Sequence, residues 1–508
     1  MKMKNIFKNI LVGGIAVSLL ASCDLNLTPT NAIVYEEGTP LFLQESDVIA
    51  FQNGVLASYR GLQYGSFTQS SDVMCDAFNA TIGFGNNYGS VHRADYTFTP
   101  ADSYVESMWG NHYIAIKNYN IAIANCLLVD DEDELKPAAD CLEGIAKFCR
   151  ASSYLTLARH FGKDYDPATA ATDLCVPLVL KYDQAEKPFR ATVKEVYNQI
   201  IQDLSDAEAL LSEVVPGEVR AQVPTVDAVY ALMARYYLDI EDYASAADYA
   251  LTVIDSEAGY ALASSSDAMI AEYTNDAGTE PIVQLFASVG EGAVGNTLYT
   301  SVQTGNDVPK YFGSLFVPTA KLVNAYGSGD LRLQAWFTNS MYPIFSSGNY
   351  YTEPYVFIKY LDNPALHTGN VEEGTHAAKP LMISEMYLIA AEAYAMAGEE
   401  GDATAILNEL RSARKAGAVV GDIMDEVKTE WFRETVGEGL RFSCLKRWGD
   451  GIAARAPQAT ATGLVMTGAA YTDRVIAADS PIFCWPVPTY EIKINGNLVQ
   501  NPGYAVEL

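Results

Sequence analysis

The sequence contains few basic residues. Lys and Arg number 33 against 63 Asp and Glu, which gives a formal net charge of −30 at pH 7. This acidic excess repels phosphate backbones and therefore argues against a nucleic-acid partner. Charged residues make up only 19% of the 508 residues, whereas hydrophobic residues make up 49%. A chain of this length and composition buries a large core, which excludes both a disordered protein and a miniprotein.

Signatures of catalysis and of metal binding are missing. The chain has no G-x-S-x-G, H-E-x-x-H, Walker A or EF-hand sequence, and its five histidines show no ligand spacing. A G-x-G-x-x-G string at residues 290–295 follows a strand-like run, but no helical pattern follows it. A dinucleotide site needs that helix, so we interpret the string as a loop. The sequence predicts no enzyme activity, no cofactor and no metal site.

The cysteines do not form a disulfide framework. Of the eight cysteines, Cys23 directly follows the N-terminal leader, and the other seven include no C-x-x-C pair. Seven is an odd number, so complete pairing is excluded. Cys141 and Cys149 lie about 12 Å apart along one predicted helix, beyond the reach of a disulfide. We therefore predict that these cysteines are small apolar residues of the core.

The first 23 residues have the order of a secretory leader. Three lysines, at positions 2, 4 and 8, precede the apolar run 10–21, which leads to Ser22 and Cys23. This order resembles a bacterial lipoprotein signal (residues 1–22), which implies cleavage before Cys23 and acylation of its thiol, for example with palmitate. The run is shorter than the roughly 20 residues that span a bilayer. Residues 23–45 lack periodicity, and we expect them to form the lipidated tether.

Helical periodicity dominates residues 46–256. The predicted helices come in pairs with alanines at their contacts, and they lie near residues 46–62, 104–128, 138–161, 191–213, 225–239 and 242–256. A second copy of the pattern covers residues 385–396 and 402–414, with Gly398 and Gly401 between the two helices. Such pairs resemble tetratricopeptide repeats. The predicted fold class is mainly α, a tetratricopeptide-like superhelix of helical pairs.

A loop-rich insertion separates the two sets of helices. Residues 257–380 are rich in Gly, Ser, Asn, Pro and aromatic residues, with strand-like runs at 281–289 and 355–361. The segment is too aromatic to be disordered, and ordered loops of this length are usually functional. We therefore expect residues 257–508 to add long irregular loops and a few short strands to the same compact fold.

Several short strings occur in a characteristic order along the chain. They include Arg150-Ala151-Ser152-Ser153-Tyr154-Leu155, residues 190–197, Asp330-Leu331-Arg332, residues 438–442, residues 445–449 and residues 500–504. Together with the leader they resemble the SusD/RagB family of Bacteroidetes outer-membrane lipoproteins. The chain departs from the family pattern at Cys444, where Asp is usual, and at residues 429–434, where the usual Glu-Arg pair is altered.

These departures predict weaker structural ion pairs. We expect Arg441 and Arg447 to bridge helices and loops through bidentate hydrogen bonds, and the tail at residues 500–504 to fasten the C-terminus.

The resemblance implies a function. It implies a lipid-anchored protein at the outer-membrane surface that captures an oligosaccharide or polysaccharide without catalysis and delivers it to a SusC-like TonB-dependent transporter. The implied partners are that transporter, the glycan and the membrane, through the lipid on Cys23. Three alternatives stay open: capture of peptides or another nutrient, a protein-interaction solenoid without a small ligand, and hydrolysis by a carboxylate pair.

A glycan site needs aromatic planes beside hydrogen-bonding side chains, because sugar rings present apolar C–H faces between hydroxyl edges. The chain is rich in tyrosine, with 32 Tyr residues. The segment 84–88 is the strongest candidate, and a second aromatic cluster contains Trp336, Tyr342, Phe345, Tyr350 and Tyr351. The predicted ligand-binding residues are Tyr64, Phe84, Asn86, Asn87, Tyr88, His92, Trp336 and Tyr350. Trp109 is instead predicted to be core, because it shares a helical face with Ile116 and Asn120.

Overall fold

The computed structural model describes residues 38–291, 294–295, 299–305 and 308–505. All helices and strands discussed below belong to one compact unit, Phe42–Leu508. The predicted signal peptide, Cys23 and most of the predicted tether lie outside the described residues. Within the described ranges, no helix has both the length and the apolar character needed to cross a membrane.

The helices predicted in the first half of the chain are present. They are α2 (Glu45–Gly61), α5 (Ser103–Cys126), α6 (Lys136–Phe161), α7 (Val193–Leu211), α8 (Val226–Asp239) and α9 (Tyr243–Ile254). Local capping defines several starts: Asp102, Thr225 and Asp242 each accept a backbone N–H, and Thr192 forms a capping box with Glu195. Two short helices were not predicted, α3 (Ser66–Met74) and α4 (Gly89–Arg93).

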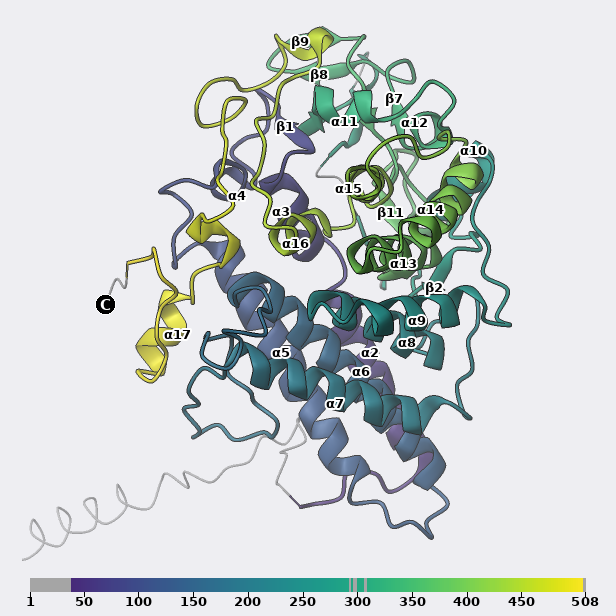
Figure 1. Ribbon diagram of the computed structural model, residues 1–508, viewed down its shortest axis with the longest axis vertical. Coiled ribbons are helices and arrows are strands. Elements are labelled where there is room, and N and C mark those ends of the chain that lie inside the picture. Colours follow the sequence, from purple (N-terminus) through teal and green to yellow (C-terminus); the bar gives the residue numbers. More distant parts are fainter. Residues whose placement is uncertain (1–37, 292–293, 296–298, 306–307, 506–508) are drawn as a thin grey trace, which may run out of the picture. The chain divides into compact units, whose positions relative to one another are not determined.

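The split helical repeats rejoin in space. Each long helix packs on the next, from α5 through α9, and α9 then packs on α13 (Ile383–Ala397), which packs on α14 (Glu400–Arg414) (Figure 1). Buried alanines let the helices approach closely, including Ala246, Ala250, Ala390 and Ala391. Gly398 ends α13 in the left-handed conformation, with φ of 80°, as expected for a helix-ending glycine. The prediction of a mainly α superhelix of helical pairs is confirmed.

The insertion between α9 and α13 is folded into short elements. These are α10 (Ser266–Thr274), β2 (Pro281–Val283), β3 (Val294–Gly295), β4 (Val302–Gly305), β5 (Val308–Phe312), β6 (Phe316–Pro318), α11 (Ala320–Ala325), α12 (Leu331–Trp336), β7 (Phe337–Thr338), β8 (Ile344–Ser346), β9 (Asn349–Tyr351), β10 (Val356–Phe357), β11 (Thr375–His376) and β12 (Leu381–Met382). The strand-like runs 281–289 and 355–361 contain only β2 and β10. Residues 294–295 of the glycine string form β3, while 292–293 lie outside the described residues.

The strands pair across long sequence separations. Two-stranded sheets join β1 (Phe78–Ala80) to β6, β2 to β12, β3 to β11 and β7 to β10. The largest sheet has the order β4-β5-β8-β9, in which β5 and β8 are parallel and the other pairs are antiparallel. This four-stranded sheet covers a small apolar core that includes Val302, Phe312 and Ile344.

The C-terminal part fastens the fold as predicted. It contains α15 (Ile423–Glu434), α16 (Arg441–Arg447) and α17 (Thr489–Ile494). Arg441 donates to both carboxylate oxygens of Asp76, at 2.9 and 3.0 Å, and Arg447 donates to both oxygens of Glu392, at 2.9 and 2.8 Å. The amide of Asn501 donates to the carbonyls of Phe161 and Trp485. The predicted bidentate and tail contacts are confirmed.

The expectation that the altered residues 429–434 weaken ion pairs is wrong. Glu430 and Glu434 both bind the fully buried Arg332, at 2.5 and 2.7 Å, and Asp330 binds it at 2.8 Å. Arg414 extends this network to a further carboxylate. The altered spacing keeps both glutamates on α15 one turn apart, so both still reach the same guanidinium group.

The core predictions hold for most of the cysteines and for Trp109. Cys75, Cys126, Cys149, Cys175 and Cys444 are buried, and none of the cysteines between residues 38 and 505 forms a disulfide. Cys141 and Cys484 are half-buried. Burial raises the pKa of the Cys444 thiol to about 11, so the thiol stays neutral and cannot act as the ion-pair partner that Asp would be. Trp109 is 2% exposed.

Candidate functional site

A row of aromatic side chains covers one face of the four-stranded sheet. Phe312 pairs with Ile344 between the parallel strands, and both are buried against the core. Because side chains alternate along a strand, the neighbouring residues Tyr311 and Phe345 lie on the opposite face. The register places Tyr350 opposite Phe345 and Gln303 opposite Tyr311, on this same outward face.

The four side chains contact one another. The Phe345 ring lies 5.0 Å from the Tyr350 ring and 5.2 Å from the Tyr311 ring, measured between centroids. The Tyr311 hydroxyl donates to Oε1 of Gln303 at 3.0 Å. Tyr350 is 43% exposed, and Tyr311 and Phe345 are half-buried. We call Gln303, Tyr311, Phe345 and Tyr350 the aromatic platform; it presents flat apolar surface bordered by a polar amide.

A tight turn positions Tyr350 on the platform. Residues Ser347 and Gly348 connect β8 to β9 and have φ values of 48° and 87°. Two successive positive φ angles are typical of the type I′ turn, whose twist matches that of the strands in a hairpin. The turn holds Tyr350 in register with Phe345.

The predicted segment 84–88 begins beside this sheet. A Cβ atom on Gly83 would lie 2.6 Å from Oγ of Ser346 on β8, so the close approach requires glycine. The backbone N–H of Ile82 donates to the Leu464 carbonyl, and the Tyr351 hydroxyl donates to the Gly463 carbonyl. Segment 463–464 therefore ties the loop to the hairpin. Ser346 and Tyr351 alternate with Phe345 and Tyr350 along the hairpin, so these contacts place the start of the loop against the core-facing side of the sheet, opposite the aromatic platform.

Three of the predicted residues on this loop lie at the surface. Asn86 and Asn87 are exposed, and Asn86 has a φ of 61°. Nη1 of Arg93 donates to Oδ1 of Asn86 at 2.8 Å, and Nδ2 of Asn87 donates to a backbone carbonyl of the same loop. The half-buried Tyr88 ring stacks on Tyr104 with centroids 4.4 Å apart. The loop thus presents two amides in a conformation held by its own hydrogen bonds.

Three other predicted residues lie in the interior. His92 is fully buried, with Nδ1 2.9 Å from the Val73 carbonyl oxygen, and burial lowers its pKa well below the usual value. Phe84 is 6% exposed, and Trp336 is 4% exposed, with the ammonium of Lys359 4.0 Å from its ring centroid. These three side chains pack the core, because their aromatic surfaces are covered by neighbouring elements. The platform does not include them.

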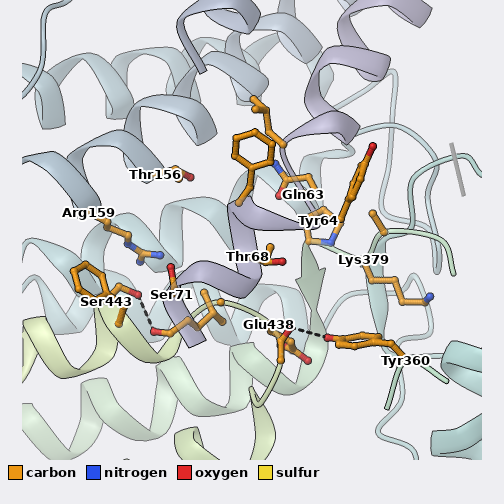
Figure 2. A pocket seen from close by; sticks show the side chains of 18 of the residues that line it. Gln63, Tyr64, Thr68, Ser71, Thr156, Arg159, Tyr360, Lys379, Glu438 and Ser443 are labelled. Carbon is orange, nitrogen blue, oxygen red and sulfur yellow. Dashed lines mark hydrogen bonds between the residues drawn. The ribbon is translucent and has the colours of Figure 1, made fainter. Parts of the chain in front are cut away.

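Tyr64 lies elsewhere, in the wall of an internal cavity of about 120 Å³ between the helical stack and the C-terminal segment 437–443. Figure 2 shows Tyr64, Tyr360 and Lys379 on one side of this cavity and Arg159 on the other. The charged groups in its wall are already paired: Arg159 with Asp239, Arg235 with Glu385, Lys379 with Asp276, and Glu438 with Lys359. The cavity is therefore a polar space between packed elements, and none of these four charged side chains is left unpaired to bind a charged ligand.

Sequence reasoning missed Gln303 and Tyr311 of the platform and found Tyr350, with Phe345 in its second cluster. Tyr311 directly precedes the buried Phe312 in a short strand. This alternation could have indicated that Tyr311 lies on the outward face. Among the described residues, no group of three or more His, Cys, Asp or Glu side chains is arranged to hold a metal ion.

Comparison with known proteins assigns the family. Residues 41–238 match a SusD-like family model described as starch-binding and associating with the outer membrane, and residues 255–504 match the model of the SusD family. The chain belongs to the SusD/RagB family. A relative, SusD-like protein P2 of Formosa agariphila, is 25% identical over 464 residues, which cover 85% of this chain and 88% of the relative.

Solved SusD structures share the fold. A SusD superfamily protein from Bacteroides thetaiotaomicron is 22% identical, with a TM-score of 0.74, and the match covers 91% of this chain and all of that one. A laminarin-binding SusD-like protein is 20% identical, with a TM-score of 0.69, and covers 90% of this chain and 99% of its own. In this SusD/RagB protein, the platform is built by the insertion between α9 and α13.

Proposed function

We propose that this SusD/RagB protein captures an oligosaccharide or polysaccharide on the aromatic platform. The observation that carries the proposal is the row of three aromatic rings on one outward sheet face. Sugar rings stack their C–H faces on such rings, and the exposed amide of Gln303 beside Tyr311 can bond hydroxyl groups. The laminarin ligand of a solved SusD-like protein with the same fold adds support.

The protein binds its glycan without breaking bonds. Hydrolysis of a glycosidic bond generally needs two carboxyl groups on either side of that bond. The side chains described for the outward face of the platform are uncharged, which supports a binding role rather than a catalytic one. Binding therefore leaves the glycan intact on the protein surface.

The protein works at the outer-membrane surface, attached through an acyl chain on Cys23, and passes the glycan to a SusC-like TonB-dependent transporter. The leader sequence supports the anchor, and the family description supports outer-membrane association. Replacement of Cys23 by Ser should release the protein from the membrane fraction and abolish labelling with a palmitate analogue. Labelled protein in the Cys23→Ser variant would contradict this anchor. Co-purification of the transporter with the lipidated chain tests the partner.

Glycan capture is tested with the chain from residue 23 onward carrying Cys23→Ser. Native affinity electrophoresis through gels that contain laminarin, starch or other polysaccharides should retard the protein in at least one gel. Failure across a broad panel, with binding to peptides instead, would overturn the proposal in favour of peptide capture by the same scaffold.

A further inference from the structure

The aromatic platform is uncharged. Its outward face carries Gln303, Tyr311, Phe345 and Tyr350. Ser301 lies on the same face, because a Cβ atom built on Gly313 would contact both the Ser301 hydroxyl and Nε2 of Gln303. Lys310 is the one charged residue among the described residues of the four strands. It directly precedes Tyr311, so its side chain lies on the face opposite the platform.

The cations in the segment that builds the platform each pair with a carboxylate. Between residues 299 and 355, the described cations are Lys310, Lys321 and Arg332. Their carboxylate partners are, in order, Glu372, Asp76 and Asp330. Arg93, on the far side of loop 84–88, lies 3.6 Å from Asp95. No free cation in these described segments is therefore available to a ligand's carboxylate or sulfate group.

The chain as a whole carries excess negative charge, and an acidic residue lies close to the platform in sequence. Glu353 is exposed two residues after the platform strand β9. Removal of the leader, which has three lysines and no acidic residue, gives the remaining chain 30 basic and 63 acidic residues, a formal charge of −33. The acidic protein would repel a polyanionic glycan, and the platform offers no cation to pair with its charged groups. Neither effect opposes the binding of an uncharged glycan.

We infer that the ligand of the platform is an uncharged polysaccharide, and that uronate-containing and sulfated polysaccharides are excluded. This inference rests on the proposed function and narrows its substrate class. Tyr311, Phe345 and Tyr350 can stack on the face of any pyranose ring. Among glycans with the same backbone, the charge of the glycan therefore determines which binds more tightly.

A matched pair of probes tests the inference. Laminarin and carboxymethylated laminarin share one backbone and differ in charge; hydroxyethyl cellulose and carboxymethyl cellulose form a second such pair. Affinity electrophoresis or calorimetry at low and at high salt should give roughly tenfold weaker binding of each carboxymethyl derivative at low salt, and a smaller difference at high salt. Equal or tighter binding of the anionic derivatives would overturn the inference while leaving glycan capture intact. Binding of no polysaccharide at all would overturn the proposed function itself.

A charge placed on the platform sharpens the test. Gln303→Lys puts one ammonium group beside Tyr311 and should increase binding of the carboxymethyl derivative in a salt-dependent manner. Gln222→Lys is the matched control, because Gln222 is exposed in the segment before α8 and the substitution changes the net charge equally. An equal gain in both variants would show that net charge, not the platform, governs binding, and would overturn the assignment to this surface.

Discussion

Phe345 and Tyr350 face each other across the β8–β9 hairpin, with ring centroids 5.0 Å apart. Replacement of Tyr350 by Ala removes the most exposed of the platform rings and leaves the buried face of the hairpin unchanged. We expect roughly tenfold weaker glycan binding, about 1.4 kcal/mol, with little change in melting temperature. Tyr490→Ala is the control, because Tyr490 is 60% exposed on α17. Equal losses in both variants would contradict the platform as the binding surface.

The contact between Gly83 and Ser346 predicts a rescue experiment. Gly83→Ala places a Cβ atom 2.6 Å from Oγ of Ser346, a buried atom, and should destabilise the protein by about 1–3 kcal/mol. Ser346→Ala removes that oxygen and leaves a Cβ at an ordinary contact distance. The double variant should therefore recover most of the stability, as measured by chemical denaturation. Additive losses in the double variant would contradict this account of the loop.

Arg332 predicts a large stability effect. Its guanidinium is fully buried and binds three carboxylates, so Arg332→Met leaves uncompensated negative charge in the core. We expect a loss of about 3–5 kcal/mol in the free energy of unfolding. Lys428→Met breaks the partly exposed pair with Asp450 and should cost about 1 kcal/mol or less. Similar unfolding midpoints for the two variants in urea would show that the buried network adds nothing beyond a surface pair.

Asp72 predicts a pH dependence of stability. Burial raises its pKa to about 7, although the backbone N–H of Gly439 donates to it at 3.1 Å. The folded state therefore holds a proton that the unfolded state has lost above about pH 3.9, so this group lowers stability as the pH rises from about 4 to 7. Asp72→Asn keeps an acceptor for Gly439 and removes the titration. The variant should gain more stability at pH 8 than at pH 5, measured by thermal denaturation.

Asp76 gives the control of opposite sign. Burial alone would raise its pKa, but Arg441 and Lys321 outweigh burial and hold the pKa well below the usual range. Its contribution to stability is present above about pH 3.9 and is lost as the pH falls below that value. Asp76→Asn should therefore destabilise the protein at pH 5 and at pH 8 alike. A gain in stability for Asp76→Asn would contradict the sign assigned to Asp76.

The helical stack could be predicted because its signals are local. Periodic apolar residues, caps such as Thr192 with Glu195, and the glycine after α13 act within a few residues of one another. The order of the short family strings likewise depends only on sequence. Helix α4 was missed because its five residues carry too little periodicity to stand out from a glycine-rich loop.

The exposure of each aromatic side chain could not be predicted from composition. Trp336 and Tyr350 belonged to one aromatic cluster in the sequence, yet Trp336 is buried against Lys359 and Tyr350 is exposed. Lys359 is held there by Glu438, 79 positions further along the chain. Burial of Trp336 therefore depends on a distant contact that leaves no local pattern.

The sequence by itself determined the family, the acidic charge and the pairing of most helices, because these depend on residue identity and on spacings of three or four positions. Only the tertiary structure decided the binding surface. The parallel pairing of Phe312 with Ile344 turns Tyr311 and Phe345 outward, and the register of β8 with β9 sets Tyr350 beside Phe345. Contacts between residues so far apart in sequence form only when the core brings their strands together, so the platform is a property of packing rather than of any segment.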